Sequence, residues 1–181
     1  QDALLFESIA ISELGAEKYV KAFVEFDNDI ISSIEMVNTF KLFKKLQQYG
    51  SLEQQGQDWY WASQYFINNE AAMLFMGDWA KGSWTAMGKV AEQDYQCVPS
   101  PGTNGVFSYN IDSFVLFKKQ HSKTEQQSQA IFVNTLVSPD FQREFSQSKG
   151  SIPARNDINL SSFDTCSKRS AIDFKQGSKV P

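Results

Sequence analysis

The chain has 181 residues, of which 41% are hydrophobic and 14% aromatic, and its formal net charge is -4 at pH 7. That length suits one domain, and the apolar content is ample for a core and unlike that of a disordered chain. The acidic balance argues against nucleic acid as a partner, because phosphate binding needs concentrated Lys and Arg. No apolar run approaches the roughly 18 residues that a membrane-spanning helix requires.

Helical periodicity dominates the first third of the chain. Residues 6–24 predict one or two short helices interrupted at Gly15. Residues 34–49 predict a longer helix, because apolar side chains recur there at spacings of three and four, and Gly50 is a plausible stop. Residues 59–68 predict a further helix that ends in a polar pair.

Short apolar segments in the middle of the chain indicate strands. Residues 71–76 are apolar throughout, which is typical of a buried strand. Asp78, in the turn that follows, can cap a helix that runs through Lys89. Residues 95–98 are a short strand candidate, and residues 109–117 are the strongest strand prediction in the sequence.

Two consecutive helices are predicted in the last third. Residues 122–125 form a capping-box pattern, which opens a helix. Its buried side is expected to carry Ala130, Val133, Leu136 and Val137. Pro139 starts the next helix, which runs to about Ser148 and is followed by Gly150.

The tail from Asn156 onward is polar and predicts only one turn, near residues 172–174. Helices separate the strand candidates throughout the chain. The fold class is therefore α/β or α+β, with more helix than strand.

The two cysteines, Cys97 and Cys166, show no CxxC, CxxH or HExxH spacing, so zinc is not expected. They are compatible with one disulfide or with two buried thiols. A bridge would close a loop of about 70 residues and would place the protein outside the cytoplasm. The only histidine, His121, lies beside a predicted helix start and is interpreted as a surface residue.

Four segments carry a family resemblance. They are residues 66–80, with the pattern A-A-M-x-x-x-G-D-W, residues 95–103, residues 109–114, with N-I-D-S-F, and residues 149–155, which read K-G-S-I-P-A-R. In order and spacing they resemble the extracellular sugar-binding proteins of ABC importers, the group that contains maltose-binding protein. The resemblance is greatest to the glucose- and mannose-binding branch, and its specific part covers roughly residues 59 to 155.

The resemblance implies a two-lobed protein that holds a sugar between its lobes. Residues 1–181 would form a single domain, the second lobe, with a helix-rich α/β fold and a small central β-sheet. The first lobe would precede Gln1, and the final helices would follow Pro181. The implied protein is periplasmic, is not an enzyme and uses no cofactor. Its partners would be a monosaccharide, its own first lobe and the membrane permease, and the isolated lobe is expected to bind weakly and to self-associate.

The same resemblance implies a disulfide between Cys97 and Cys166, and a sugar site made of Trp79, Asn110 and two charged residues, Asp112 and Lys149. Sugars present hydroxyls at the rim and C–H groups on one face, so their sites combine polar side chains with aromatic platforms. Trp79 follows a predicted strand at a Gly-Asp turn, which suits a platform. The alternative is an indole buried in the core.

The three polar candidates also have alternative roles. Asn110 and Asp112 are two apart on a predicted strand, so they would share a face and could contact sugar hydroxyls. They could instead cap the strand end through local hydrogen bonds. Lys149 could donate to the sugar and balance Asp112, or it could simply interact with the helix dipole. Arg155 fits the family turn but is expected to brace the loop.

Two other functions stay open on sequence alone. A glycoside-processing enzyme fragment would need two carboxylates flanking a sugar bond. Asp78 and Asp112 are the only acids near the expected cleft, and nothing in the sequence pairs them. A scaffold or interaction domain with the same fold and no ligand is the second alternative, and the presence of Trp79, Asn110, Asp112 and Lys149 argues against it.

Overall fold

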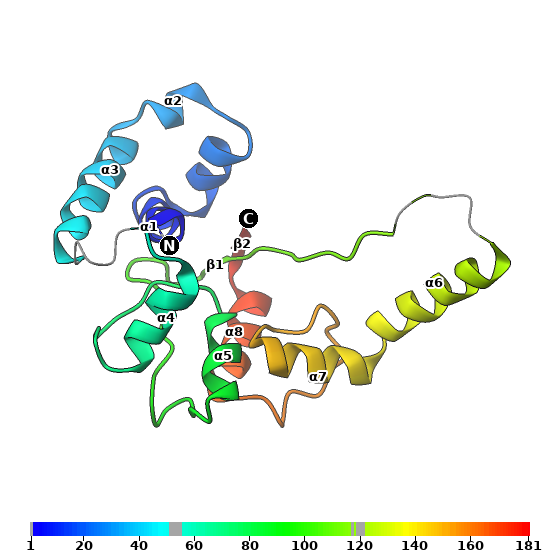
Figure 1. Ribbon diagram of the computed structural model, residues 1–181. Coiled ribbons are helices and arrows are strands. Elements are labelled where there is room, and N and C mark those ends of the chain that lie inside the picture. Colours follow the sequence, from blue (N-terminus) through cyan, green and yellow to red (C-terminus); the bar gives the residue numbers. More distant parts are fainter. Residues whose placement is uncertain (1, 51–55, 117, 119–121) are drawn as a thin grey trace.

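The computed structural model describes residues 2–50, 56–116, 118 and 122–181. Its first third is a helical unit formed by α1 (Asp2–Phe23), the short α2 (Asn28–Ile31), α3 (Ile34–Leu46) and the 3-10 turn η1 (Gln47–Tyr49) (Figure 1). Gly15 has a φ of 70° and a ψ of 170°, so it interrupts α1 as predicted. His121, interpreted above as a surface residue, lies outside the described residues.

The helical unit has its own hydrophobic core. Buried side chains of α1 pack against α3 and the end of the chain, and they comprise Ala10, Ile11, Leu14, Tyr19, Ala22, Met36 and Val180. At the edge of this core the Phe6 ring lies 5.1 Å from the Phe40 ring and 5.6 Å from the Phe43 ring, measured between centroids. Ser33 caps α3 by accepting a hydrogen bond from the backbone of Met36.

A second core lies among α4 (Trp59–Ile67), α5 (Ala80–Ala86) and α8 (Thr165–Gln176). Its buried members are Ile67, Ala80, Trp84, Tyr95 and Cys166. The indole Nε1 of Trp84 donates to the Ser63 carbonyl oxygen at 3.3 Å, so this buried polar atom is satisfied. Cys97 and Cys166 form a disulfide with a Cα–Cα distance of 5.6 Å, and the pairing implied by the resemblance is therefore confirmed.

Two short strands form the sheet of the described chain. β1 (Val106–Ser108) pairs in parallel with β2 (Ser178–Val180), with Val106 opposite Ser178. The helices α6 (Lys123–Leu136), α7 (Pro139–Lys149) and α8 lie between these strands in the sequence. The helix-rich α/β fold with a small sheet is confirmed, and both strands lie beside α1 (Figure 1).

The three strand predictions are wrong for the residues that the structure describes. Residues 71–76 and 109–116 have no strand assignment, and Phe117 is not described. Within 95–98 only Tyr95 forms an isolated bridge, with Ala91. A strand exists only where a neighbouring strand supplies hydrogen bonds. In the stretch from residue 109, the Tyr109 N–H donates to the Val180 carbonyl oxygen at 2.9 Å, but β2 ends there and the pairing goes no further among the described residues. The extended segment after β1 instead leads away from the helical body toward α6 (Figure 1).

The helix predictions are more successful, with three corrections. α5 begins with Trp79 at its N-cap and no side-chain cap, so Asp78 does not cap it, and it ends at Ala86 before reaching Lys89. The capping box at Ser122 is confirmed, but no residue of α6 is buried, so the expected buried side is wrong.

The third correction is α8, which the sequence analysis reduced to one turn. Asp164 caps this helix, and its buried residues are only Cys166, Ser167 and Ala171. The helix is polar overall, and its few apolar residues, although they recur with helical spacing, did not mark it as an element that packs on the core. None of the helices in the described ranges is both long and apolar enough to cross a membrane.

Candidate functional site

The four predicted sugar-site residues line one large hollow. Its volume is about 2360 Å³, and its walls include Trp79, Asn110, Asp112 and Lys149. Small-molecule sites typically enclose 300–1,000 Å³, so the hollow is larger than one sugar needs. The four residues line this hollow together with many others, so the lining alone does not define a binding site within it.

Trp79 lies at the entrance to α5, with its ring folded over the preceding turn. A Cβ built on Gly77 would lie 2.1 Å from ring atom Cζ3 of Trp79, so only glycine leaves room for the indole. Trp79 is half-buried and is not part of the second core, whereas Trp84 is. Both indoles line the hollow, Trp84 from within the second core and Trp79 from its half-buried position at the start of α5.

A close contact between α5 and α7 brings Trp79 and Lys149 to the same place. A Cβ on Gly82 would lie 2.6 Å from the carbonyl oxygens of Ser148 and Lys149. A Cβ on Gly150 would lie 2.6 Å from the carbonyl oxygen of Asp78. Gly150 also has a φ of 87°, which favours glycine at the end of α7. Two glycines therefore allow the first turn of α5 to touch the last turn of α7.

Lys149 and Asp112 form an ion pair across the hollow's edge. The Lys149 ammonium contacts Oδ2 of Asp112, as the sequence analysis anticipated. The Lys149 side chain is 30% exposed and that of Asp112 is 65% exposed. At such exposure the pair adds little to stability, so both groups are free to exchange this contact for ligand hydroxyls at a small cost.

Asn110 and Asp112 do not lie on a strand, so the prediction that they share a strand face is not confirmed. Both residues belong to the extended segment that follows β1, and both are exposed. Since this segment has no strand partner among the described residues, the alternation of faces does not fix the direction of either side chain. Both residues line the hollow.

A partly buried ion pair made by Lys81, two residues after Trp79, is not predicted from the sequence. Lys81 is 4% exposed, and its ammonium donates to both carboxylate oxygens of Asp164, at 3.2 and 3.3 Å, and to Ser167 Oγ at 2.6 Å. In sequence, a lysine in a short helix is typical of a solvated surface, and a partner 83 residues away gives no local signal.

The surroundings shift the pKa values of two carboxyl groups, those of Asp78 and Asp164, in opposite directions. Burial raises the pKa of Asp78, although Lys81 and Lys149 act in the opposite direction. Burial alone would also raise the pKa of Asp164, but the hydrogen bond from the Ser167 backbone and the charge of Lys81 outweigh it and lower the pKa. Asp164 is therefore the stable anionic partner, and Asp78 is a half-buried acid on the wall of the hollow.

Arg155 braces the turn after α7, as expected. Its Nη1 donates to the Val137 carbonyl oxygen at 3.1 Å, and its guanidinium pairs with Asp157. It does not line the hollow.

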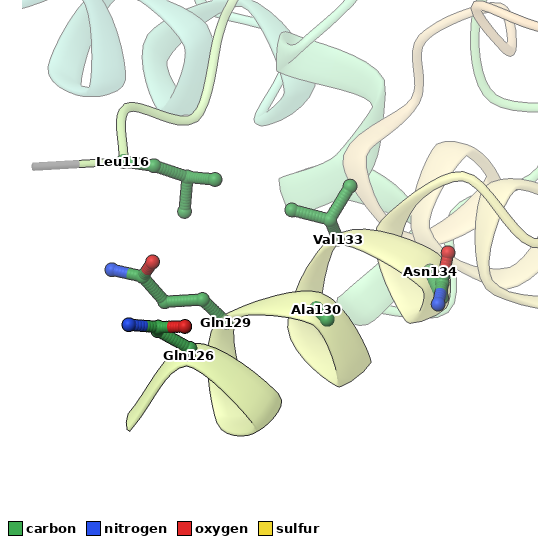
Figure 2. A pocket seen from close by; sticks show the side chains of 6 residues that line it. All are labelled: Leu116, Gln126, Gln129, Ala130, Val133 and Asn134. Carbon is green, nitrogen blue, oxygen red and sulfur yellow. The ribbon is translucent and has the colours of Figure 1, made fainter. Parts of the chain in front are cut away.

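A smaller hollow of about 370 Å³ lies on α6 (Figure 2). An apolar floor made of Leu116, Ala130 and Val133 is bordered by three amide side chains, those of Gln126, Gln129 and Asn134. Figure 2 shows Gln126 and Gln129 next to one another at one end of the hollow and Asn134 at the other end, so the three amides do not point to one place.

Comparison with known proteins gives a consistent picture. Residues 4–169 match the family described as "Bacterial extracellular solute-binding protein". The chain is 37% identical over 176 residues to a "Probable sugar-binding periplasmic protein" of Brucella suis, covering 97% of this chain and 41% of that protein. A protein of the same name from Rhizobium meliloti is also 37% identical, with 97% and 42% covered.

A more distant relative is the "Xylose/arabinose-binding protein XacG" of Haloferax volcanii, which is 28% identical over 158 residues, with 87% of this chain and 33% of that protein covered. The chain thus spans about two fifths of the length of the first relatives. All three names describe binding and none describes catalysis.

Proposed function

This chain belongs to the bacterial extracellular solute-binding proteins, and we propose that it supplies one lobe of a periplasmic protein that binds a sugar and delivers it to an ABC importer. The observation that supports the proposal is that an indole, an amide and a Lys–Asp ion pair all line one hollow. The relatives named as sugar-binding periplasmic proteins support the ligand class and the compartment.

The chemistry of these four side chains suits a hexose. The indole of Trp79 offers a flat apolar surface for the C–H face of the ring. Asp112 accepts hydrogen bonds from hydroxyls, Lys149 donates to them, and Asn110 does both. We propose that a monosaccharide such as glucose or mannose binds here and that its hydroxyls replace part of the contact between Lys149 and Asp112.

The remaining contacts would come from polypeptide outside residues 1–181. The relatives are more than twice as long as this chain, and the proposed first lobe and final helices lie in the additional length. Those parts would cover the apolar walls of the hollow, and closure of two lobes would enclose the sugar. The lobe alone would bind with millimolar affinity or weaker, because about half of the contacts are missing.

Isothermal titration calorimetry of the full-length protein with a panel of D-glucose, D-mannose, D-galactose and D-xylose tests the proposal. We expect one hexose to bind saturably and Asp112→Asn to weaken its binding about tenfold or more, since a hydrogen bond to a charged group contributes roughly 1.5–3 kcal/mol.

Asp157→Asn is the matched control, because Asp157 is also an exposed acid paired with a cation but does not line the hollow. Absence of binding by every sugar in the panel contradicts the proposed function. Equal affinities of the two variants would remove Asp112 from the site.

A further inference from the structure

A partly buried cluster of Lys81, Asp164 and Ser167 lies at the first turn of α5, which Trp79 precedes. Ser167 Oγ donates to Asp164 Oδ2 at 2.8 Å, and the Ser167 backbone N–H donates to Asp164 Oδ1 at 2.8 Å. Lys81 completes the cluster through its bonds to both residues. The Lys81 and Ser167 side chains are buried and that of Asp164 is 34% exposed, so a partly buried cluster joins the first turn of α5 to the first turn of α8.

The first turn of α5 is thereby held on two sides. On one side it touches the last turn of α7 through Gly82 and Gly150. On the other side Lys81 ties it to α8, whose own first turn carries the disulfide at Cys166. Trp79 is the residue that enters this turn, and the Trp79 carbonyl oxygen accepts from the Gly82 N–H at 3.2 Å.

We propose that Lys81 is a positioning residue for the sugar site: its buried ion pair with Asp164 fixes the first turn of α5 and, through it, the Trp79 indole. Lys81 does not need to touch the sugar, because its ammonium is already occupied by three protein oxygens. The inference rests on the proposed function only in the experiment that measures sugar binding.

The cost of burying charge explains why the Lys81–Asp164 pair would fix the arrangement of the helices more than it would stabilise the folded state. Removing two charges from water costs about as much as their attraction returns, and buried pairs are often replaceable by apolar residues without loss of stability. Their directional bonds nevertheless select one arrangement of the elements that they join. Lys81 and Asp164 join two helices whose relative placement decides where Trp79 lies.

Fluorine NMR of the full-length protein labelled with 5-fluorotryptophan measures this placement without any ligand. The Trp79 resonance is assigned by its loss in Trp79→Phe. We expect Lys81→Met to shift or broaden the Trp79 resonance and to leave the resonances of Trp59 and Trp61 in place. The double variant Lys81→Met/Asp164→Asn removes both charges, so it keeps the melting temperature near that of the wild type and still displaces the Trp79 resonance.

Lys89→Met is the matched control, because Lys89 follows the same helix and pairs with Asp94 at 3.5 Å near the surface. It should leave the Trp79 resonance unchanged. The double variant has the same net charge as the wild type. If its Trp79 resonance is unchanged, the proposal is overturned.

A titration with D-glucose supplies the second readout. The double variant is expected to bind about tenfold more weakly than the wild type, whereas Lys89→Met binds equally well. Absence of glucose binding by the wild type would count against the proposed hexose ligand. The fluorine spectra would then still decide the role of Lys81, so the two failures are distinguishable.

Discussion

The helical unit α1–α3 and the walls of the hollow differ in how completely their apolar residues are packed. In the helical unit, Leu14 is 7% exposed and belongs to a continuous buried core. Around the hollow, Leu116 is 47% exposed and Phe114 is 58% exposed. The helical unit combines a buried core with exposed apolar side chains such as Ile34 and Phe40, which are 66% and 57% exposed, whereas Phe114 and Leu116 belong to neither buried core of the described residues. This contrast is what a lobe would show if further polypeptide of the same protein completes it.

The largest expected effect concerns the disulfide that ties the hollow's rim to α8. Because the Cys97–Cys166 bond closes a loop of 69 residues, the double variant Cys97→Ala/Cys166→Ala should lose about 4 kcal/mol of unfolding free energy in the chain-entropy model. Urea unfolding of the full-length protein measures the loss. Reduction of the wild type should produce the same shift, and a variant as stable as the oxidised wild type would contradict the assignment.

Matched leucine substitutions compare the two regions directly. Leu14→Ala should cost about 3 kcal/mol both in the 181-residue chain and in the full-length protein, because it leaves a cavity in a complete core. Leu116→Ala should cost less than about 1 kcal/mol in the 181-residue chain, where the side chain is half-exposed, and about 2 kcal/mol in the full-length protein. Equal small costs of Leu116→Ala in both proteins would show that nothing covers the hollow.

The contact of α5 with α7 gives the next effect. Gly150→Ala should cost about 2 kcal/mol or more, since its Cβ would meet a backbone carbonyl and its φ is left-handed. Gly88→Ala is the control, because Gly88 has a φ of 77° with nothing within 4 Å. It should cost only about 1 kcal/mol, the price of the backbone conformation alone. Similar costs in urea unfolding of the full-length variants would contradict the close contact.

The smallest expected effect is a dependence of folding stability on pH that comes from Asp78. Its folded pKa is raised above the ordinary 3.8, so the folded state holds this proton more tightly, and stability falls as pH rises through the interval between the two pKa values. Asp78→Asn removes that fall. The variant should melt at a higher temperature than the wild type at pH 7, and the difference should vanish near pH 3.

Calorimetric scans across that pH range make the Asp78 comparison. Asp140→Asn, an exposed acid on α7, is the control for loss of one negative charge. A gain that is the same at pH 7 and at pH 3 would contradict a titrating Asp78.

The same contrast explains how much the sequence predicts. Helical signals are local: Gly15, the capping box at Ser122 and the pair Ser138-Pro139 each mark an element that the structure contains. Strand predictions failed at 71–76 and at the described residues 109–116, because an apolar run indicates burial but cannot supply the neighbour that makes it a strand. The failed strands line the hollow, where neighbours from outside the described residues are proposed.

Side-chain partners were predictable only in part. The Lys149–Asp112 contact was anticipated because the family resemblance already placed both residues at one site, and the disulfide followed from the same resemblance. Lys81 and Asp164 are far apart in sequence and belong to a short helix and to a polar one, so no periodic pattern marks either residue as buried.

The most direct test of the account is a tryptophan fluorescence titration of the full-length protein with D-glucose and D-mannose, repeated with Trp79→Ala and with Trp59→Ala. Trp59 is an exposed tryptophan at the start of α4 and does not line the hollow. We expect a saturable change for one of these hexoses that Trp59→Ala retains and Trp79→Ala abolishes or weakens strongly. A saturable change that survives in Trp79→Ala with unaltered affinity would contradict the platform, and no response to either sugar would contradict the hexose site.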